Sequence, residues 1–153
     1  MQRRIISTLG AISLMIGLGG CTGIGQTPPT YADLDREPTA QDQLPASSIG
    51  DGSDGFTIDA DTARLVAVQG DTEVFLASAT EQGHDRVCLF VFAADGPLRS
   101  CGGESFAMSD SVNEYRVLPD AVAGTELDPD EGWTRLSDNV FTRPVAEDTR
   151  DTQ

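Results

Sequence analysis

The feature that most constrains the fold is a series of three short apolar runs separated by glycine-containing breaks. The runs occupy residues 63–68 (ARLVAV), 72–79 (TEVFLASA) and 86–92 (RVCLFVF). Runs this short and this rich in Val, Leu and Phe are typical of β-strands, whereas helices need longer apolar patterns. Tight turns are expected at Gly70-Asp71 and Asp95-Gly96, so the three runs predict an antiparallel meander.

The third run predicts a strand that is buried on both faces. Every residue from Val87 to Phe92 is apolar or cysteine, and neighbouring residues of a strand point to opposite faces. Such a strand fits the centre of a sandwich or a covered sheet, whereas an uncovered face would form a binding patch. Further strand candidates lie at 105–109, 115–118 and 133–141. Together they predict a small all-β, sandwich-like domain at residues 56–141.

Cys88 and Cys101 are expected to form a disulfide. A symmetric hairpin centred on Ala94 and Asp95 would place the two cysteines opposite one another. The preferred turn, Asp95-Gly96, is offset by one residue, which predicts a bulge or a longer loop. Such a bond would add about 3 kcal/mol to a domain with a thin core. The alternative is two free thiols, with Cys88 buried as a small hydrophobe; a redox site is disfavoured because the Cys-x-x-Cys spacing is absent.

The first twenty residues predict a secretory signal peptide. Arg3 and Arg4 precede an apolar segment, residues 5–18, that is too short to span a membrane comfortably. The segment ends in Leu18-Gly19-Gly20-Cys21, which resembles the bacterial lipobox. That resemblance implies cleavage between Gly20 and Cys21 and attachment of a diacylglycerol to the Cys21 thiol. An ordinary secretory signal, an uncleaved anchor and twin-arginine export are the alternatives.

Residues 21–55 and 142–153 are expected to be disordered. The first segment contains four of the eight prolines, is acidic, and its few apolar residues follow neither a strand nor a helix period. Such a segment buries too little apolar surface to offset its ordering entropy. It is therefore predicted to be a flexible tether between the lipid and the domain, and residues 142–153 are predicted to be a frayed polar tail.

The charge of the chain excludes nucleic acid as an expected partner. The sequence contains 25 acidic residues and ten arginines, with no lysine, and its net charge is −15. Removal of residues 1–20 takes away Arg3 and Arg4 but no acid, which changes the net charge to −17. This charge repels phosphate backbones and anionic lipid headgroups. Membrane attachment would therefore depend on the lipid, and two acyl chains are enough for stable anchoring.

Residues 63–103 resemble the core of small lipoproteins and secreted domains from high-GC Gram-positive bacteria, and residues 131–141 are similar to the ends of such chains. The residues that carry the resemblance are Arg64, Gly70, Val87-Cys88-Leu89 and Cys101-Gly102. The resemblance implies an extracytoplasmic β-rich module. It implies no activity and assigns no catalytic residue.

Two single residues are candidates for chemistry or recognition. His84, the only histidine, lies beside Asp85, but a Ser-His-Asp triad also needs a nucleophile, and the Gly-x-Ser-x-Gly motif is absent. A solvated loop histidine is therefore expected. Trp133, the only tryptophan, is expected to pack onto the sheet; the alternative is a platform that stacks against a carbohydrate.

The acidic stretches 50–62 and 126–133 offer oxygen ligands of the kind that calcium prefers. Their spacing departs from that of a calcium loop, of which Asp51, Asp54 and Gly55 form only a fragment. A solvated acidic surface is therefore expected, and no metal ion or other cofactor is predicted.

These features predict a lipid-anchored, extracytoplasmic protein that binds a partner and has no catalytic activity. Its expected contacts are the membrane, through the lipid on Cys21, and an envelope or extracellular partner. Two alternatives remain. An apolar cleft containing His84 and an acid within hydrogen-bond distance would favour an accessory envelope hydrolase. Absence of both a pocket and an exposed apolar patch would favour a purely structural wall protein.

Overall fold

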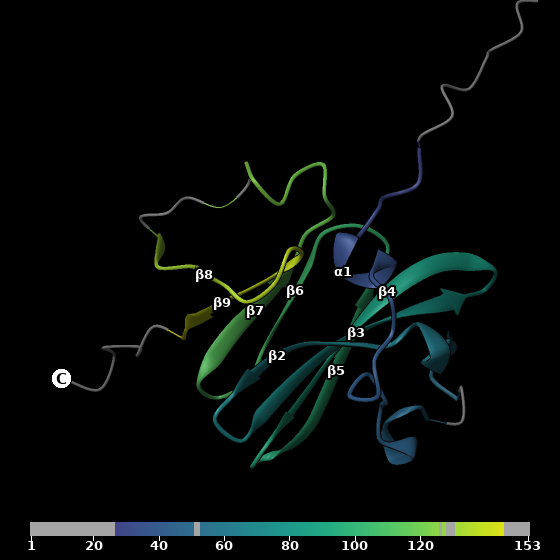
Figure 1. The fold of residues 1–153 in the computed structure, drawn as a ribbon, viewed down its shortest axis with the longest axis horizontal. Coiled ribbons are helices and arrows are strands. Elements are labelled where there is room, and N and C mark those ends of the chain that lie inside the picture. The colour runs from purple at the N-terminus through teal and green to yellow at the C-terminus, as the bar shows by residue number, and fades with distance from the viewer. Residues whose placement is uncertain (1–26, 51–52, 126, 128–130, 146–153) are drawn as a thin grey trace, which may run out of the picture.

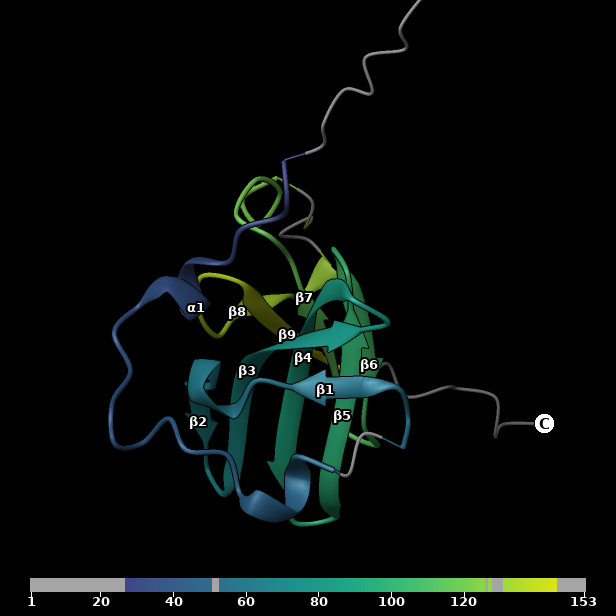
Figure 2. The same cartoon turned by 90° about the vertical axis from the view of Figure 1, so that its right-hand side faces the viewer.

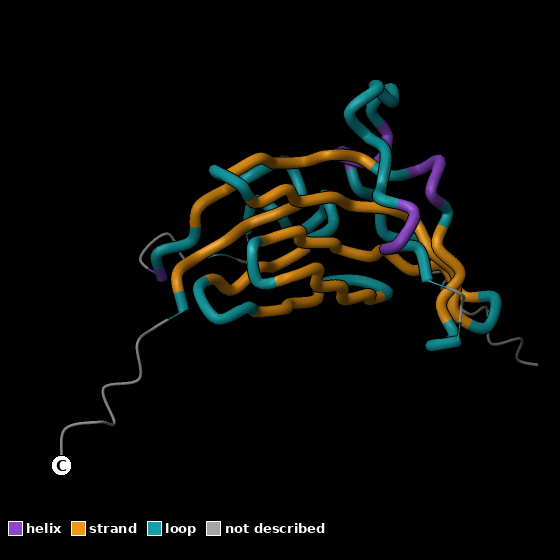
Figure 3. Tube along the Cα trace, turned by 90° about the horizontal axis from the view of Figure 1, so that it is seen from below, coloured by secondary structure: helices purple, strands orange, loops and turns teal. Residues whose placement is uncertain are grey.

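The chain folds into two antiparallel sheets, the first of which curls into a half-barrel (Figure 1). The computed structural model describes residues 27–50, 53–125, 127 and 131–145 of the 153-residue chain. The all-β class expected from the apolar runs is confirmed. Figure 3 shows that the short helical segments lie outside the sheets. None of the helices in the described residues is long and apolar enough to cross a membrane.

The first sheet has the strand order β1-β3-β4-β5, with β2 paired to β3 beside β1, and the second has the order β6-β7-β9-β8. The strands are β1 (Phe56–Ile58), β2 (Arg64–Gln69), β3 (Thr72–Glu81), β4 (His84–Ala93), β5 (Gly96–Gly102), β6 (Phe106–Ser109), β7 (Asn113–Val117), β8 (Thr134–Arg135) and β9 (Val140–Pro144). The helical segments are α1 (Ala32–Asp35), η1 (Ala46–Ser48) and η2 (Ala60–Thr62).

Tight turns set the register of the first sheet. The turn between β3 and β4 consists of Gln82 and Gly83, both with positive φ (52° and 81°), as the right-handed twist of a two-residue hairpin requires. The turn between β4 and β5 consists of Ala94 and Asp95, because Ala93 pairs with Gly96. The bulge predicted near this turn is wrong: the β4–β5 register runs without a shift, and the irregularity of the sheet lies instead in β2, between Leu65 and Ala67.

The disulfide between Cys88 and Cys101 is present, as predicted. The two residues are direct partners in the β4–β5 register, with their Cα atoms 4.0 Å apart. The symmetric hairpin centred on Ala94 and Asp95 therefore brings the two thiols together without further distortion of the ladder.

Strand β4 is buried on both faces, as its sequence predicts. Val87, Leu89 and Val91 belong to an apolar cluster that includes residues of the second sheet, namely Tyr115, Val117 and Val140. Cys88 and Phe90 belong to a second cluster, together with Leu44, Ile58 and Ala63. The first face is thus covered by the second sheet. The opposite face is covered by the segments that precede and follow β1.

Residues 27–50 differ from the disordered tether that was expected over 21–55. Figure 2 shows this segment running along one side of the half-barrel, from α1 to the turns before β1. Tyr31, Asp33, Asp42 and Leu44 in it are buried. Residues 53–55 are also described, whereas 21–26, including Cys21, lie outside the described residues.

Polar side chains, together with Tyr31 in the first apolar cluster, hold the first part of this segment. The Ala32 amide donates to Asp120 Oδ1 (2.8 Å) and the Asp33 amide donates to Asn139 Oδ1 (3.0 Å). In return, the Asn139 amide donates to Asp33 Oδ2 (2.9 Å). The hydroxyl of Tyr31 donates to the Glu104 carbonyl (2.9 Å). These bonds satisfy backbone groups that an apolar contact would leave unpaired.

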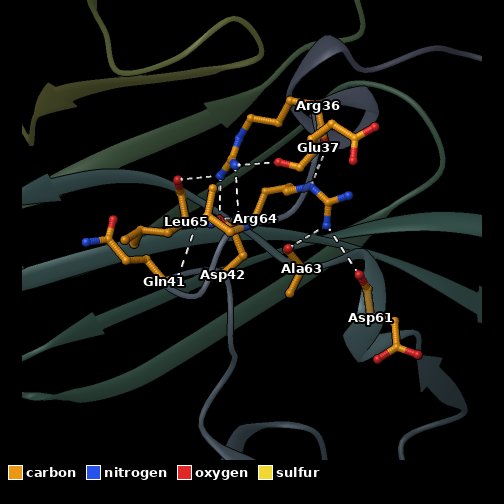
Figure 4. Close-up of polar contacts among 9 residues, drawn as sticks. Arg36, Glu37, Gln41, Asp42, Asp61, Ala63, Arg64 and Leu65 are labelled. Atoms are coloured by element: carbon orange, nitrogen blue, oxygen red, sulfur yellow. Dashed lines mark hydrogen bonds and ion pairs between the residues drawn. The ribbon is translucent and has the colours of Figure 1, made fainter.

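An ion pair holds the second part of the segment against the edge of β2 (Figure 4). The guanidinium of Arg36 donates to the carboxylate of Asp42 and to the Leu65 carbonyl (3.0 Å). Asp42 Oδ1 in turn accepts from the Leu65 amide (2.7 Å). Together, Arg36 and Asp42 supply the donor and the acceptor that a neighbouring strand would supply at this position of the edge. Arg64 adds a further bond, from its Nε to the Arg36 carbonyl (2.9 Å).

The C-terminal boundary also differs from the expected tail over 142–153. Residues 142–144 belong to β9, and Thr142 is buried and donates its hydroxyl to the Glu114 carbonyl (3.1 Å). Arg143 forms an ion pair with Glu114 (2.7 Å). The ladder with β7 therefore extends past the point where the sequence turns polar, and residues 146–153 lie outside the described residues.

Candidate binding groove

A groove of about 710 Å³ lies between the N-terminal segment and one end of the first sheet. Its floor comes from the end of the β3–β4 hairpin. Along one face of β3, the core residues Val74 and Leu76 are followed by Ser78 and Thr80, which line the groove. Because residues two apart share a face of a strand, the change from apolar to hydroxyl side chains marks the place where the covered core ends and the groove begins.

The N-terminal segment forms the opposite wall of the groove. Pro28, Pro29, Tyr31 and Leu34 line it. The two prolines hold φ near −65° and have no amide donor to satisfy, so the wall is preorganised and apolar. Tyr31 is 5% exposed. Burial, together with the charges of Glu104 and Asp120, raises its pKa to about 12, and the phenol therefore stays neutral.

The polar lining of the groove is predominantly acidic. Asp35, Asp59 and Asp85 all line it and all are exposed. Arg86 is the one basic residue among the described lining residues, and its Nε donates to Glu81 Oε2 (3.0 Å). The positive charge of Arg86 is thus already engaged. The lining presents three carboxylates whose charge is not balanced by a free base.

His84 and Asp85 are neighbours in the sequence, but only one of them lines the groove. Both belong to β4 and both are exposed, but only Asp85 is among the described residues that line the groove. The disulfide lies elsewhere, because Cys88 is buried in the cluster on the opposite face of β4. The cleft containing His84 and an acid, which would have favoured a hydrolase, is not formed by the described residues.

The candidate lipidation and metal residues fall partly outside the described residues. This applies to Leu18, Gly19, Gly20 and Cys21, and also to Asp51. Asp54 forms an ion pair with Arg99 and accepts a hydrogen bond from the Phe56 amide (3.2 Å). Within the described ranges, no group of three or more His, Cys, Asp or Glu side chains is placed to hold a metal ion.

Trp133 packs onto the second sheet through arginines instead of through the apolar core. It is half-buried and belongs to neither apolar cluster among the described residues. The guanidiniums of Arg143 and Arg116 lie 4.5 Å and 5.1 Å from its ring centroid, a distance typical of cation–π contacts. Its Nε1 donates to Glu131 Oε2 (3.2 Å). The ring is thus already occupied by side chains of this protein, which disfavours a carbohydrate platform.

Sequence reasoning missed the residues that build the groove wall. Pro28, Tyr31 and Leu34 lie in a segment expected to be disordered, and their spacing follows no strand or helix period. Asn139 and Asp120, which hold that segment, are far from it in the sequence. The one readable signal was the change from apolar to hydroxyl residues within TEVFLASAT, which marks where β3 leaves the core.

The described residues thus combine a preorganised apolar wall, a hydroxyl-lined floor and an acidic rim in one groove. Comparisons with protein-family models, curated proteins and solved structures find no match for this chain.

Proposed function

We propose that the protein is a lipid-anchored, extracytoplasmic binding protein without catalytic activity. The observation that carries the proposal is the position of the groove. Its wall includes Pro28 and Pro29, only seven and eight residues after Cys21. If Cys21 bears the lipid, seven residues of chain can span at most about 25 Å. The groove would therefore open close to the outer surface of the membrane.

Two further features support an extracytoplasmic location. Disulfides persist in oxidising compartments and are rare in the cytosol, so the Cys88–Cys101 bond hints at export. The Leu18-Gly19-Gly20-Cys21 sequence follows an apolar segment of the length used by signal peptides. For a domain of net charge −17 after cleavage, two acyl chains would supply the attachment that charge opposes.

The groove also favours a binding protein over the two alternatives, a hydrolase and a purely structural wall protein. A binding protein needs a preformed concave site with a few polar groups, and the groove between Tyr31 and Thr80 supports that reading. The hydrolase alternative depended on His84 in the cleft beside an acid, and His84 is not among the described lining residues. A purely structural wall protein would have no use for such a site.

Fractionation of the native host tests the anchor. The unmodified protein should be found in the membrane fraction and take up a radiolabelled fatty acid. The variant Cys21→Ser should take up no label and appear in the medium, because it lacks the thiol that accepts the lipid. Thr22→Ser, a neighbouring change outside the lipobox, should behave as the unmodified protein does. Membrane retention of Cys21→Ser, or full-length protein in the cytosol with residues 1–20 intact, would refute the proposal.

A further inference from the structure

We propose that the groove binds a short extended segment of a basic polypeptide. This inference rests on the proposed binding function and names the class of partner. The volume of the groove, about 710 Å³, lies within the range of ligand sites in proteins, about 300–1,000 Å³. The proposal follows from three properties of the lining: its charge, its apolar wall and its strand edge.

The charge of the lining selects a cationic partner. Asp35, Asp59 and Asp85 are exposed at the groove, while the guanidinium of Arg86 is paired with Glu81. The whole chain has a net charge of −15, so its long-range field also attracts a basic partner and repels an acidic one. The same field disfavours an anionic lipid headgroup in the groove.

The apolar wall suits the side chains of such a segment. Lys and Arg place a long alkyl stem along apolar surface while the charged end reaches toward carboxylates or water. Pro28, Pro29 and Leu34 offer that surface on the N-terminal wall, while Asp59 and Asp85 lie on the side of the sheet. A peptide that alternates basic and apolar residues would therefore meet both kinds of lining at once.

The strand edge favours an extended backbone. Residues 57–59, in and just after β1, line the groove. In the described part of the chain, β1 pairs with one strand only, β3. A strand with one partner retains a second edge, which an extended peptide can join. Among the backbone donors of β1, the Phe56 amide already donates to Asp54 Oδ1 (3.2 Å). The hydroxyls of Thr57 and Thr80 lie on the same lining.

Fluorescence anisotropy with two labelled peptides tests the proposal. One peptide alternates lysine and valine over seven residues, and the other alternates glutamate and valine. The full chain carrying Cys21→Ser is used, so that binding is measured without the lipid and the result is independent of the anchor. The basic peptide should bind at least tenfold more tightly than the acidic one, and its affinity should fall as salt is raised. Equal affinities, or no binding of the basic peptide, would overturn the proposal.

Matched variants separate the groove from the general negative charge. Asp35→Asn combined with Asp85→Asn should weaken binding of the basic peptide by about tenfold, since each exposed charge pair contributes modestly. The control, Asp71→Asn with Glu73→Gln, removes the same charge at the other end of β3 and should change affinity less than twofold. Thr80→Lys, an exposed change on the floor, should abolish binding. Equal weakening by both double variants would refute the groove as the site.

A vesicle arm distinguishes a peptide from a membrane surface as the occupant. Phosphatidylglycerol and phosphatidylcholine vesicles are added to the same Cys21→Ser chain in the presence of the basic peptide. The proposal expects neither kind of vesicle to displace the basic peptide, because the acidic lining repels the anionic headgroup of phosphatidylglycerol and phosphatidylcholine has no net charge for it to attract. Binding of vesicles that exceeds peptide binding and that Thr80→Lys alters would identify a lipid surface instead and overturn the peptide proposal. Loss of the lipid anchor in the fractionation experiment would leave this binding result unchanged.

Discussion

The β3–β5 meander and the N-terminal segment 27–50 are both packed into the fold, but different interactions hold them. In the meander, consecutive strands pair through short turns, and both faces of β4 lie in apolar clusters. In the N-terminal segment, Tyr31 and Leu44 join these clusters, but most of the specific contacts are polar: hydrogen bonds to residues remote in the sequence and the Arg36–Asp42 ion pair within the segment. The Asp33 amide, for example, reaches Asn139 across 106 residues.

This difference predicts different responses to mutation. Apolar burial is shared among many neighbours, so its loss weakens the whole cooperative unit. A network of polar bonds depends on a few atoms, and leaving one of them buried without a partner has a large local cost. The meander should therefore respond as part of the global fold. The N-terminal segment should be able to open without unfolding the sheets.

The largest effect is expected from shortening a core side chain of the meander. Leu89 is fully buried, so Leu89→Ala should lower the free energy of unfolding by about 4 kcal/mol through lost burial and a cavity. The same change in the N-terminal segment, Leu34→Ala, should cost about 1 kcal/mol because Leu34 is only half-buried. Urea unfolding monitored by far-UV circular dichroism measures both. Equal losses would contradict the proposed contrast between the two regions.

The second effect concerns the cross-link in the meander. Replacing both Cys88 and Cys101 by Ala should lower the free energy of unfolding by about 3 kcal/mol, because the unfolded chain gains the entropy of an open loop. Alanine is the better choice at position 88, where the side chain is fully buried and a serine hydroxyl would lack a partner. Urea unfolding of the double variant gives the value. A change below about 1 kcal/mol would show that the ladder alone fixes the hairpin.

How far the sequence predicts each region follows from the same physics. The meander is predictable because Val, Leu and Phe recur in short runs between glycine turns, and because Cys88 and Cys101 are equidistant from the centre of a hairpin. All of these signals are local. The predicted bulge failed because Ala94 and Asp95 form the turn, with Gly96 (φ 116°) already in β5.

The N-terminal segment could not be predicted, because its stabilising contacts leave no periodic pattern. Tyr31, Leu34 and Leu44 are too few and too irregularly spaced to indicate a strand or a helix. Asp33 and Asp42 look like solvated acids of an acidic tether, and only the fold places Asn139 and Leu65 beside them. The groove was missed for the same reason, since one wall of it belongs to this segment.

A smaller, local effect is expected at the polar junction. Asn139 is fully buried, and its side chain accepts from the Asp33 amide and donates to the Leu118 carbonyl (2.9 Å) and to Asp120 (2.9 Å). Asn139→Leu should lower the stability of this junction by about 2 kcal/mol, because these three groups would lose their hydrogen-bond partner. Hydrogen exchange should rise at residues 31–35 while the amides of β3 and β4 stay protected. Gln41→Leu, an exposed change in the same segment, should alter neither.

The stability of this junction should depend on pH through the charge of Asp120. Burial acts to raise the pKa of Asp120, but hydrogen bonds from Asn139, the Ala32 amide and Thr30 outweigh it and hold the pKa below its usual value. The charged form is thus the one that the native junction favours. In Asn139→Leu, one of these bonds is lost, and acid should release the segment at a higher pH than in the unmodified protein.

The smallest effect, and the most specific, is expected where Asp42 meets the edge of β2. The Arg36 guanidinium, with the amides of Thr39 and Leu65, holds the pKa of Asp42 well below its usual range despite burial. A carboxyl with a depressed pKa in the folded state stabilises that state above its unfolded pKa of about 4. The contribution is lost as the pH falls below about 4, through the folded value. Its size should be about 1 kcal/mol, since Arg36 is partly exposed to screening solvent.

The Leu65 amide reports on this contact directly, because it donates to Asp42 Oδ1 (2.7 Å) and not to a neighbouring strand. In Asp42→Asn, an NH₂ group must face donors on Arg36, Thr39 or Leu65, so exchange of the Leu65 amide should rise severalfold at pH 6. Near pH 3 the difference from the unmodified protein should persist, because the depressed pKa keeps Asp42 ionised there; it should shrink only as the pH falls further, through the folded pKa. A difference that stays constant with pH would mean that shape, rather than charge, holds the segment against β2.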